Sequence, residues 1–420
     1  MNGQERTTKN RIPEIAVLLI IGSILVWWSA FLQPRWSDYD FNHYYVSGRM
    51  LLTGQNPYTS SLETVSHSLG FRFEPDLPIA TYPPAFLWVF APLALFPPRA
   101  AFAIWVASEL IFLALILWLT RRLLGDQLSQ RGWLLVVVLA VVSRAVTYNL
   151  YFSQPQLFLA ALVLSGYAAL RAGRPGWACV VVSTAGMFKI YPFVLLPWFL
   201  WSGGGGLRER SRRLIGVIGF ILAVVALTGP GLWRDFFRYS MPTIAGWEEV
   251  GRTFHFSLPA LLTNLGYASA NFHPSQEAKR GWWVLGTCAG LVVFAAAYVK
   301  CFLSKGNLED QFCLLSVAML IGTVTMQGHY LVFLIFPLTV AALHLNGKAN
   351  SGNLVFLIVM LWTLNTIDPP ELPFLSRHAY LNVLASDLPL YGLLALGVFF
   401  WRKLHSRRQF GGERPQQEML

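Results

Sequence analysis

The residues best suited to chemistry lie in one polar stretch, residues 36–84, of a chain otherwise dominated by hydrocarbon side chains. Asp38 and Asp40 lie within it, His43 follows Asp40 by about one helical turn, and aromatic residues surround them. Aromatic surroundings can raise the pKa of a carboxylate toward the range of a general base. We therefore expect any catalytic chemistry to occur in this stretch.

Simpler explanations exist for the same residues. Asp40 could lie on a solvated face of a surface helix. Asp38 and Asp40 could instead hold a divalent cation, but two carboxylates alone are a weak metal signature, and we expect no metal site. The four cysteines lie in or beside apolar runs without paired spacing, which favours neither a disulfide framework nor a metal cluster.

The composition predicts an all-α polytopic membrane protein. Hydrophobic residues make up 55% of the 420 residues, charged residues only 13%, and the mean hydropathy is +0.49. The net charge of +11 could suggest nucleic-acid binding, but the basic residues concentrate in loops at one end of the apolar runs. The positive-inside rule explains that distribution, so we expect a protein of the cell (inner) membrane that binds membrane lipids and no nucleic acid.

The apolar runs predict about 12 transmembrane helices in a single domain, residues 1–420. A first span at 13–32 follows basic residues and is typical of an uncleaved signal anchor, which places the amino terminus in the cytoplasm. Residues 346–420 hold the last two spans and a basic cytoplasmic tail. The spans after the first are predicted at 99–120, 132–147, 156–170, 176–188, 191–202, 214–229, 282–299, 311–326, 330–345, 353–367 and 388–401.

Two amphipathic surface helices are predicted in the first outer loop. The spacing of apolar residues from 40 to 53 predicts one, with Asp40, His43 and Ser47 on its polar face. Residues 85–96 are apolar but too short to cross a membrane, and prolines bound them, which predicts the second.

Polar residues that are unusual in an apolar chain fall at the outer ends of the predicted spans, as a single cavity would require. Lys189 is the most informative, because a lysine at mid-membrane costs about 2.5 to 3.5 kcal/mol. It should either reach the membrane surface or meet an anion such as a lipid phosphate. His329 could also be an ordinary hydrogen-bonded residue at a helix end. The set comprises Asp38, Asp40, Gln154, Gln156, Lys189, His255, Gln327, His329 and Tyr330.

Six blocks along about residues 30–345 follow one another in a recognisable order. They are DFNHYYVSGRMLLTGQNPY, YPPAFLWVFAPLALFP, SQPQLFLAAL, FKIYPFVLLP, FHFSL and GHYLVFLIFP. In these blocks the chain resembles glycosyltransferase family 87, the polyprenol-phosphate-mannose-dependent α-mannosyltransferases of the GT-C fold. The resemblance implies a GT-C-like bundle that transfers a hexose, typically mannose, from a polyprenyl phosphate to an acceptor hydroxyl.

The resemblance also implies roles for individual residues on the extracytoplasmic face, with no cofactor. Asp40, which precedes Phe and a Tyr-Tyr pair, matches the catalytic base best, and Asp38 is second. Transfer would proceed by a single displacement with inversion onto a glycan or glycolipid acceptor, and Lys189 would stabilise the departing phosphate. The other donor-binding candidates are His329, Tyr330, Gln154, His43 and His255.

Two departures from the family pattern leave alternatives open. SQPQ stands where the family often has a glycine-glutamine pair, so either Gln154 or Gln156 could be the match. His255 stands where the family often has asparagine.

Two other classes of protein also have many membrane spans. A flippase or secondary transporter would be expected to show internal repeats and polar residues at the membrane midplane, and neither is evident here. A polymerase or ligase of lipid-linked sugars would use a large outer loop between late spans, and the long segment at 233–280 keeps that class open.

Overall fold

The computed structural model describes residues 40–71, 79–244, 255–269, 275–304, 306–346, 351–366 and 378–406. Within these ranges the regular structure is helical, apart from one isolated bridge between His255 and Gln327. The expectation of an all-α protein is therefore confirmed. The predicted first span at 13–32, Asp38 and the end of the basic tail lie outside the described residues.

Within the described residues, four segments are long and apolar enough to cross a membrane. They are α5 (Pro98–Leu124) with η3 (Gly125–Gln127), α11 (Leu207–Thr228), α16 (Gln276–Leu303), and η6 (Gly328–Leu334) with α18 (Ile335–Asn346). Two bent pairs raise the number to six if each pair is one span. These pairs are α6 (Gln130–Val142) with α7 (Arg144–Tyr151), and α20 (Ala379–Ser386) with α21 (Leu388–Ser406).

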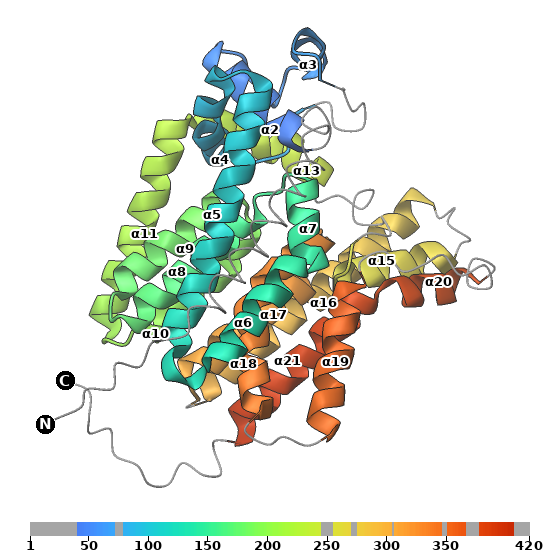
Figure 1. The fold of residues 1–420 in the computed structure, drawn as a ribbon. Coiled ribbons are helices and arrows are strands. Elements are labelled where there is room, and N and C mark those ends of the chain that lie inside the picture. Colours follow the sequence, from blue (N-terminus) through green and yellow to red (C-terminus); the bar gives the residue numbers. More distant parts are fainter. Residues whose placement is uncertain are drawn as a thin grey trace, which may run out of the picture.

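Shorter helices occupy the other predicted spans after residue 99. None reaches the roughly 20 residues that a straight crossing of the hydrocarbon core requires. They are α8 (Gln156–Arg171), α9 (Pro175–Phe188), η4 (Tyr191–Leu195) with α10 (Leu196–Ser202), α17 (Leu308–Gly322) and α19 (Ser351–Asn365). α8 packs against α5 and α9, whereas α17 packs against α16 and α21, so two groups of helices form the bundle (Figure 1).

The bounds of α5 follow from its sequence. Pro98 occupies the first turn, where a missing backbone N–H costs nothing. Gly125 ends the helix with a positive φ of 52°, and Arg121 and Arg122 complement the negative end of the helix dipole.

The helix predicted from residue 40 is present as α2 (Asp40–Leu52), and it lies with α3 (Glu63–Ser68) at one end of the bundle (Figure 1). Its polar face is not solvated, because His43 and Ser47 are buried. α4 (Pro84–Phe90) and η2 (Ala91–Leu95) pack against α2 and cover it. Asp40, for which a solvated face was the simpler explanation, is half-buried at the start of this helix.

The predicted outer segment at 233–280 is largely helical where the structure describes it. Its helices are α12 (Pro230–Asp235), the π-helical η5 (Phe236–Ser240), α13 (Met241–Ile244) and α15 (Leu258–Ser269). α15 packs along α16. His255, Phe256 and Ser257, which precede α15 in the FHFSL block, are buried.

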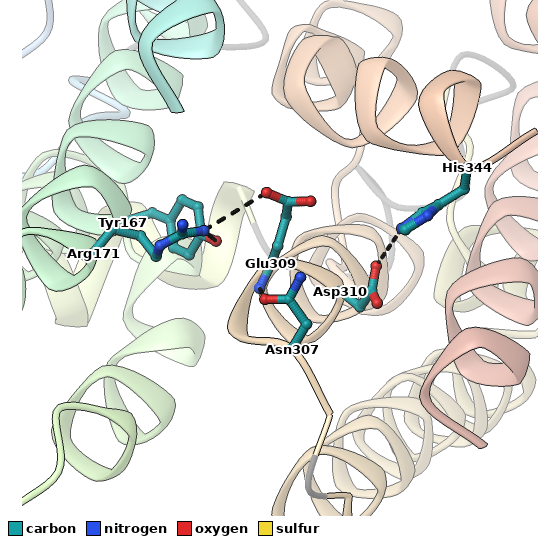
Figure 2. Close-up of polar contacts among 6 residues, drawn as sticks. All are labelled: Tyr167, Arg171, Asn307, Glu309, Asp310 and His344. Carbon is teal, nitrogen blue, oxygen red and sulfur yellow. Dashed lines mark hydrogen bonds and ion pairs between the residues drawn. The ribbon is translucent and has the colours of Figure 1, made fainter. Parts of the chain in front are cut away.

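A polar cluster, in which Glu309 and Asp310 are buried, joins three helices at the other end of the bundle. At the start of α17, Glu309 lies 3.7 Å from Arg171 of α8, and Asp310 lies 2.8 Å from Nε2 of His344 of α18 (Figure 2). Tyr167 accepts a hydrogen bond from Arg171 at 3.2 Å. α8 begins at Gln156 and η6 begins at Gly328, and both helical segments end near this cluster. The cluster therefore fixes the ends of two helical segments whose opposite ends approach the candidate site.

We expect Asp310→Ala to lower the free energy of unfolding by about 3 kcal/mol, because it removes one partner of a buried polar pair. The measurement is thermal unfolding of the purified protein in detergent. Asp310→Asn is the matched control, since its side-chain oxygen can still accept a hydrogen bond from His344. Equal unfolding temperatures for the alanine variant and the wild type would show that the pair contributes no stability.

Candidate functional site

A cavity of about 810 Å³ collects residues from distant parts of the chain. Its lining includes Asp40 at the start of α2, Gln154 between α7 and α8, and Lys189 between α9 and η4. His329 and Tyr330 of η6 line it as well. Six of the nine residues predicted for one cavity, these five and Gln327, therefore line one space, although up to 290 positions separate them. Gln156 and His255 do not line it.

The side-chain amide of Gln154 connects the acidic and basic sides of the cavity. Its nitrogen donates a hydrogen bond to the Asp40 carboxylate. Its oxygen accepts one from the Tyr82 hydroxyl at 2.9 Å and one from the Lys189 ammonium at 3.4 Å. A carboxylate and an ammonium thus flank the same amide.

Lys189 is held by aromatic residues. Its ammonium donates to the Tyr82 hydroxyl at 3.1 Å and lies 4.8 Å from the ring centroids of both Tyr82 and Tyr330, within the range of a cation–π contact. Desolvation lowers the pKa of Lys189 below its ordinary value, and the nearby charge of Asp40 opposes that shift. The ammonium therefore lies against aromatic and amide groups of the cavity.

Two tyrosines of the site were not identified from the sequence. The Tyr82 hydroxyl accepts hydrogen bonds from Lys189 and from Tyr44, at 3.0 Å from the latter, and donates to Gln154. The Tyr191 hydroxyl donates to Gln156 at 2.6 Å. Each tyrosine directly precedes a proline near the start of a helical segment. Tyr191 follows Lys189 by two residues, and Tyr82 lies just before the second predicted surface helix. These positions were the signals that the sequence offered.

The remaining histidines occupy different positions. His329 is buried and packs on Tyr330, with 5.0 Å between the ring centroids. His255 does not line the cavity but contacts Gln327, which does, with 3.2 Å between Nε2 of each side chain. His43, only 6% exposed on α2, also lies outside the lining, and burial lowers its pKa to about 4.

One side of the cavity is apolar. Leu291 and Phe294 of α16 line it together with Met241 and Ile244 of α13. α16 is one of the four segments able to cross a membrane, and Leu291 is 61% exposed. The cavity therefore offers polar groups at its centre and hydrocarbon contacts on a side formed by an apolar helix.

Comparison with known proteins assigns the chain to a family of enzymes. Residues 80–337 match the family model of glycosyltransferase family 87, which is more than half of the chain. The chain belongs to glycosyltransferase family 87. This confirms the family resemblance and makes the chain a membrane glycosyltransferase.

A relative of this family 87 chain is the polyprenol-phosphate-mannose-dependent alpha-(1-2)-phosphatidylinositol pentamannoside mannosyltransferase of Mycolicibacterium smegmatis (strain ATCC 700084 / mc(2)155). The two are 27% identical over 196 residues. That alignment covers 45% of this chain and 44% of the relative, so the chain spans less than half the length of the relative it matches.

The family 87 match includes most of the cavity but not all of it. Tyr82, Gln154, Lys189 and His329 lie within residues 80–337, whereas Asp40 precedes them. The assignment of Asp40 to the site therefore rests on its contact with the Gln154 amide and on its place in the cavity lining. Among the described residues no group of three or more His, Cys, Asp or Glu side chains could hold a metal ion.

In this family 87 enzyme we expect Tyr82→Phe to lower kcat/KM for the sugar donor about tenfold, because hydrogen bonds to charged groups contribute roughly 1.5 to 3 kcal/mol. The variant keeps the ring under the ammonium but removes the hydroxyl shared by Lys189 and Gln154. Tyr167→Phe, which removes a buried hydroxyl beside Arg171 at the other end of α8, is the control. Equal losses in both variants would mean that the Tyr82 hydroxyl has no specific role.

Proposed function

We propose that the chain transfers a hexose, most simply mannose, from a polyprenyl-phosphate donor to an acceptor hydroxyl with inversion. The observation that carries the proposal is the Gln154 amide, which contacts both the Asp40 carboxylate and the Lys189 ammonium. A base and a cation on either side of one space suit a reaction in which a proton is removed and a phosphate departs.

In the proposed reaction the acceptor oxygen attacks the anomeric carbon as the bond from that carbon to the phosphate oxygen breaks. Asp40 takes the proton of the acceptor hydroxyl. The polyprenyl phosphate leaves with the electron pair of the broken bond, and the Lys189 ammonium stabilises the charge that develops on it. A single displacement inverts the anomeric configuration.

The rest of the cavity supports this arrangement of substrates. His329 and Tyr330 lie beside Lys189, where they would contact the phosphate or the sugar. The apolar side at Leu291 and Phe294 would receive the first part of the polyprenyl chain from the membrane. His43 and His255, which lie behind the lining, would support it from outside the cavity.

For the membrane we propose a GT-C-like bundle with about 12 crossings, in which the shorter helices cross together with neighbouring segments. The cavity would face the extracytoplasmic side of the inner membrane, because the basic loops gather at the opposite ends of the helices. The acceptor would be a glycan or glycolipid, the second by analogy with the phosphatidylinositol pentamannoside that the relative is named for.

The test is an assay of the purified protein in lipid nanodiscs, with polyprenyl-phosphate mannose or a nucleotide-activated mannose as donor. We expect transfer to a glycolipid or glycan acceptor only from the lipid-linked donor. The product, analysed by NMR, should have the anomeric configuration opposite to that of the donor. Transfer from the nucleotide sugar alone, or a retained configuration, would contradict the proposal.

A further inference from the structure

α5 contains a carboxylate that the proposed reaction does not use. Glu109 lies within this candidate span, is only 1% exposed and does not line the cavity. A carboxylate inside a membrane segment is costly, and such residues are typically functional or paired with a partner. The contacts of Glu109 therefore indicate what it does.

Glu109 links the end of α7 to the beginning of α8. Its Oε2 accepts a hydrogen bond from the Asn149 side chain at 2.9 Å. The backbone N–H groups of Leu157 and Phe158, in the first turn of α8, face the same carboxylate.

Asn149 extends the link to both sides of the intervening loop. Its side-chain oxygen accepts a hydrogen bond from the backbone N–H of Gln156 at 3.1 Å. Its backbone carbonyl accepts one from the backbone N–H of Gln154 at 2.8 Å. Because Asn149 also contacts Glu109, this single residue connects the Glu109 carboxylate to the backbone of Gln154.

The loop itself has an unfavourable backbone conformation. Ser153 has a φ of 57°, in the left-handed region that residues other than glycine rarely adopt. Trp105, one turn before Glu109 on α5, donates a hydrogen bond from its ring nitrogen to the Ser153 carbonyl at 2.9 Å. Such a conformation persists only when surrounding contacts fix it, and here α5 supplies them.

We propose that Glu109 and Trp105 are positioning residues that hold the Gln154 amide between Asp40 and Lys189. This inference rests on the proposed function of that site. Neither residue touches the substrates. They act by fixing the loop on which Gln154 lies, and a misplacement of about 1 Å in such a group can reduce a reaction rate about a hundredfold.

The first test is a double-mutant cycle between Glu109 and Gln154, read as kcat with saturating donor and acceptor. Glu109→Leu should lower kcat about 30-fold in the wild type but less than twofold in a Gln154→Ala background. Glu109→Gln, which keeps an acceptor for Asn149, should stay within about threefold of the wild type. A 30-fold loss in both backgrounds would overturn the proposal.

The second test needs no catalysis and so separates this inference from the proposed function. Hydrogen exchange, followed by mass spectrometry on the purified protein in nanodiscs, measures protection of the peptide that contains residues 149–156. Glu109→Leu and Trp105→Phe should each speed exchange there about tenfold, whereas Glu109→Gln should not.

The two readouts have distinct outcomes. Unchanged exchange in Glu109→Leu and Trp105→Phe would overturn the positioning role whatever the enzyme transfers. Faster exchange in a protein that transfers no sugar from lipid-linked donors would support the positioning role and contradict the proposed function. Trp105→Phe keeps the indole site filled by a ring, so it provides the test even if Glu109→Leu does not fold.

Discussion

Asp40→Asn should lower kcat for sugar transfer by about 10³-fold or more, since a positioned general base contributes about 10² to 10⁴ to a rate. Asparagine retains the shape of aspartate and an oxygen that accepts a hydrogen bond from Gln154, but it cannot take up the proton of the acceptor. The measurement is transfer from polyprenyl-phosphate mannose by purified protein in nanodiscs, with the protein concentration matched between variants.

The control for Asp40 is Asp38→Asn, which removes the carboxylate two residues earlier. We expect this variant to be expressed and to unfold at the wild-type temperature while retaining most of its activity. Normal turnover by Asp40→Asn would remove the base assignment. Loss of activity in Asp38→Asn alone would move the role by two residues, to the second candidate.

Lys189→Met should lower kcat/KM for the donor by about 10²- to 10³-fold, because it removes the charge that would stabilise the departing phosphate. Methionine retains an apolar chain of similar length between the rings of Tyr82 and Tyr330, so the packing is largely preserved. Lys189→Arg retains the charge and should recover part of the rate. Unchanged kcat/KM in Lys189→Met would show that the ammonium does not contact the donor.

The pH dependence provides a second readout for Lys189. Desolvation lowers the pKa of this ammonium, so in the free enzyme its charge is present at low pH and is lost as the pH rises through that lowered pKa. Wild-type kcat/KM for the donor should therefore fall on the alkaline side, at a pH below the ordinary range of lysine. That decline should be absent in Lys189→Met.

Much of the helical structure could be predicted from hydropathy, because each predicted span after residue 99 coincides with a helix. The number of crossings could not, because helices such as α8 and α9 are too short to be judged by length. Their role depends on neighbouring segments and on the membrane, which the sequence pattern of a single helix does not encode. The helix expected from residue 40 is present, but its burial under α4 and η2 depends on tertiary packing.

The residues of the candidate site could also be predicted only in part. Asp40, Gln154, Lys189 and His329 could be identified because polar residues at the ends of apolar runs are conspicuous. Tyr82 was missed, since its place beside a proline is only a weak signal and its role is clear only when its hydroxyl is seen between Lys189 and Gln154. Glu109 was overlooked because a single carboxylate within a long apolar run does not reveal which loop it contacts.

The most direct test of the central claim is a cryo-EM structure of the protein in nanodiscs with a non-transferable polyprenyl-phosphate sugar analogue. We predict density for the phosphate within hydrogen-bonding distance of the Lys189 ammonium, with the anomeric carbon facing the Asp40 carboxylate across the Gln154 amide. The separate apolar cavity of about 840 Å³ lined by α6, α18 and α19 is the clearest alternative location. Density for the lipid phosphate in that apolar cavity, with none between Asp40 and Lys189, would contradict the proposed site.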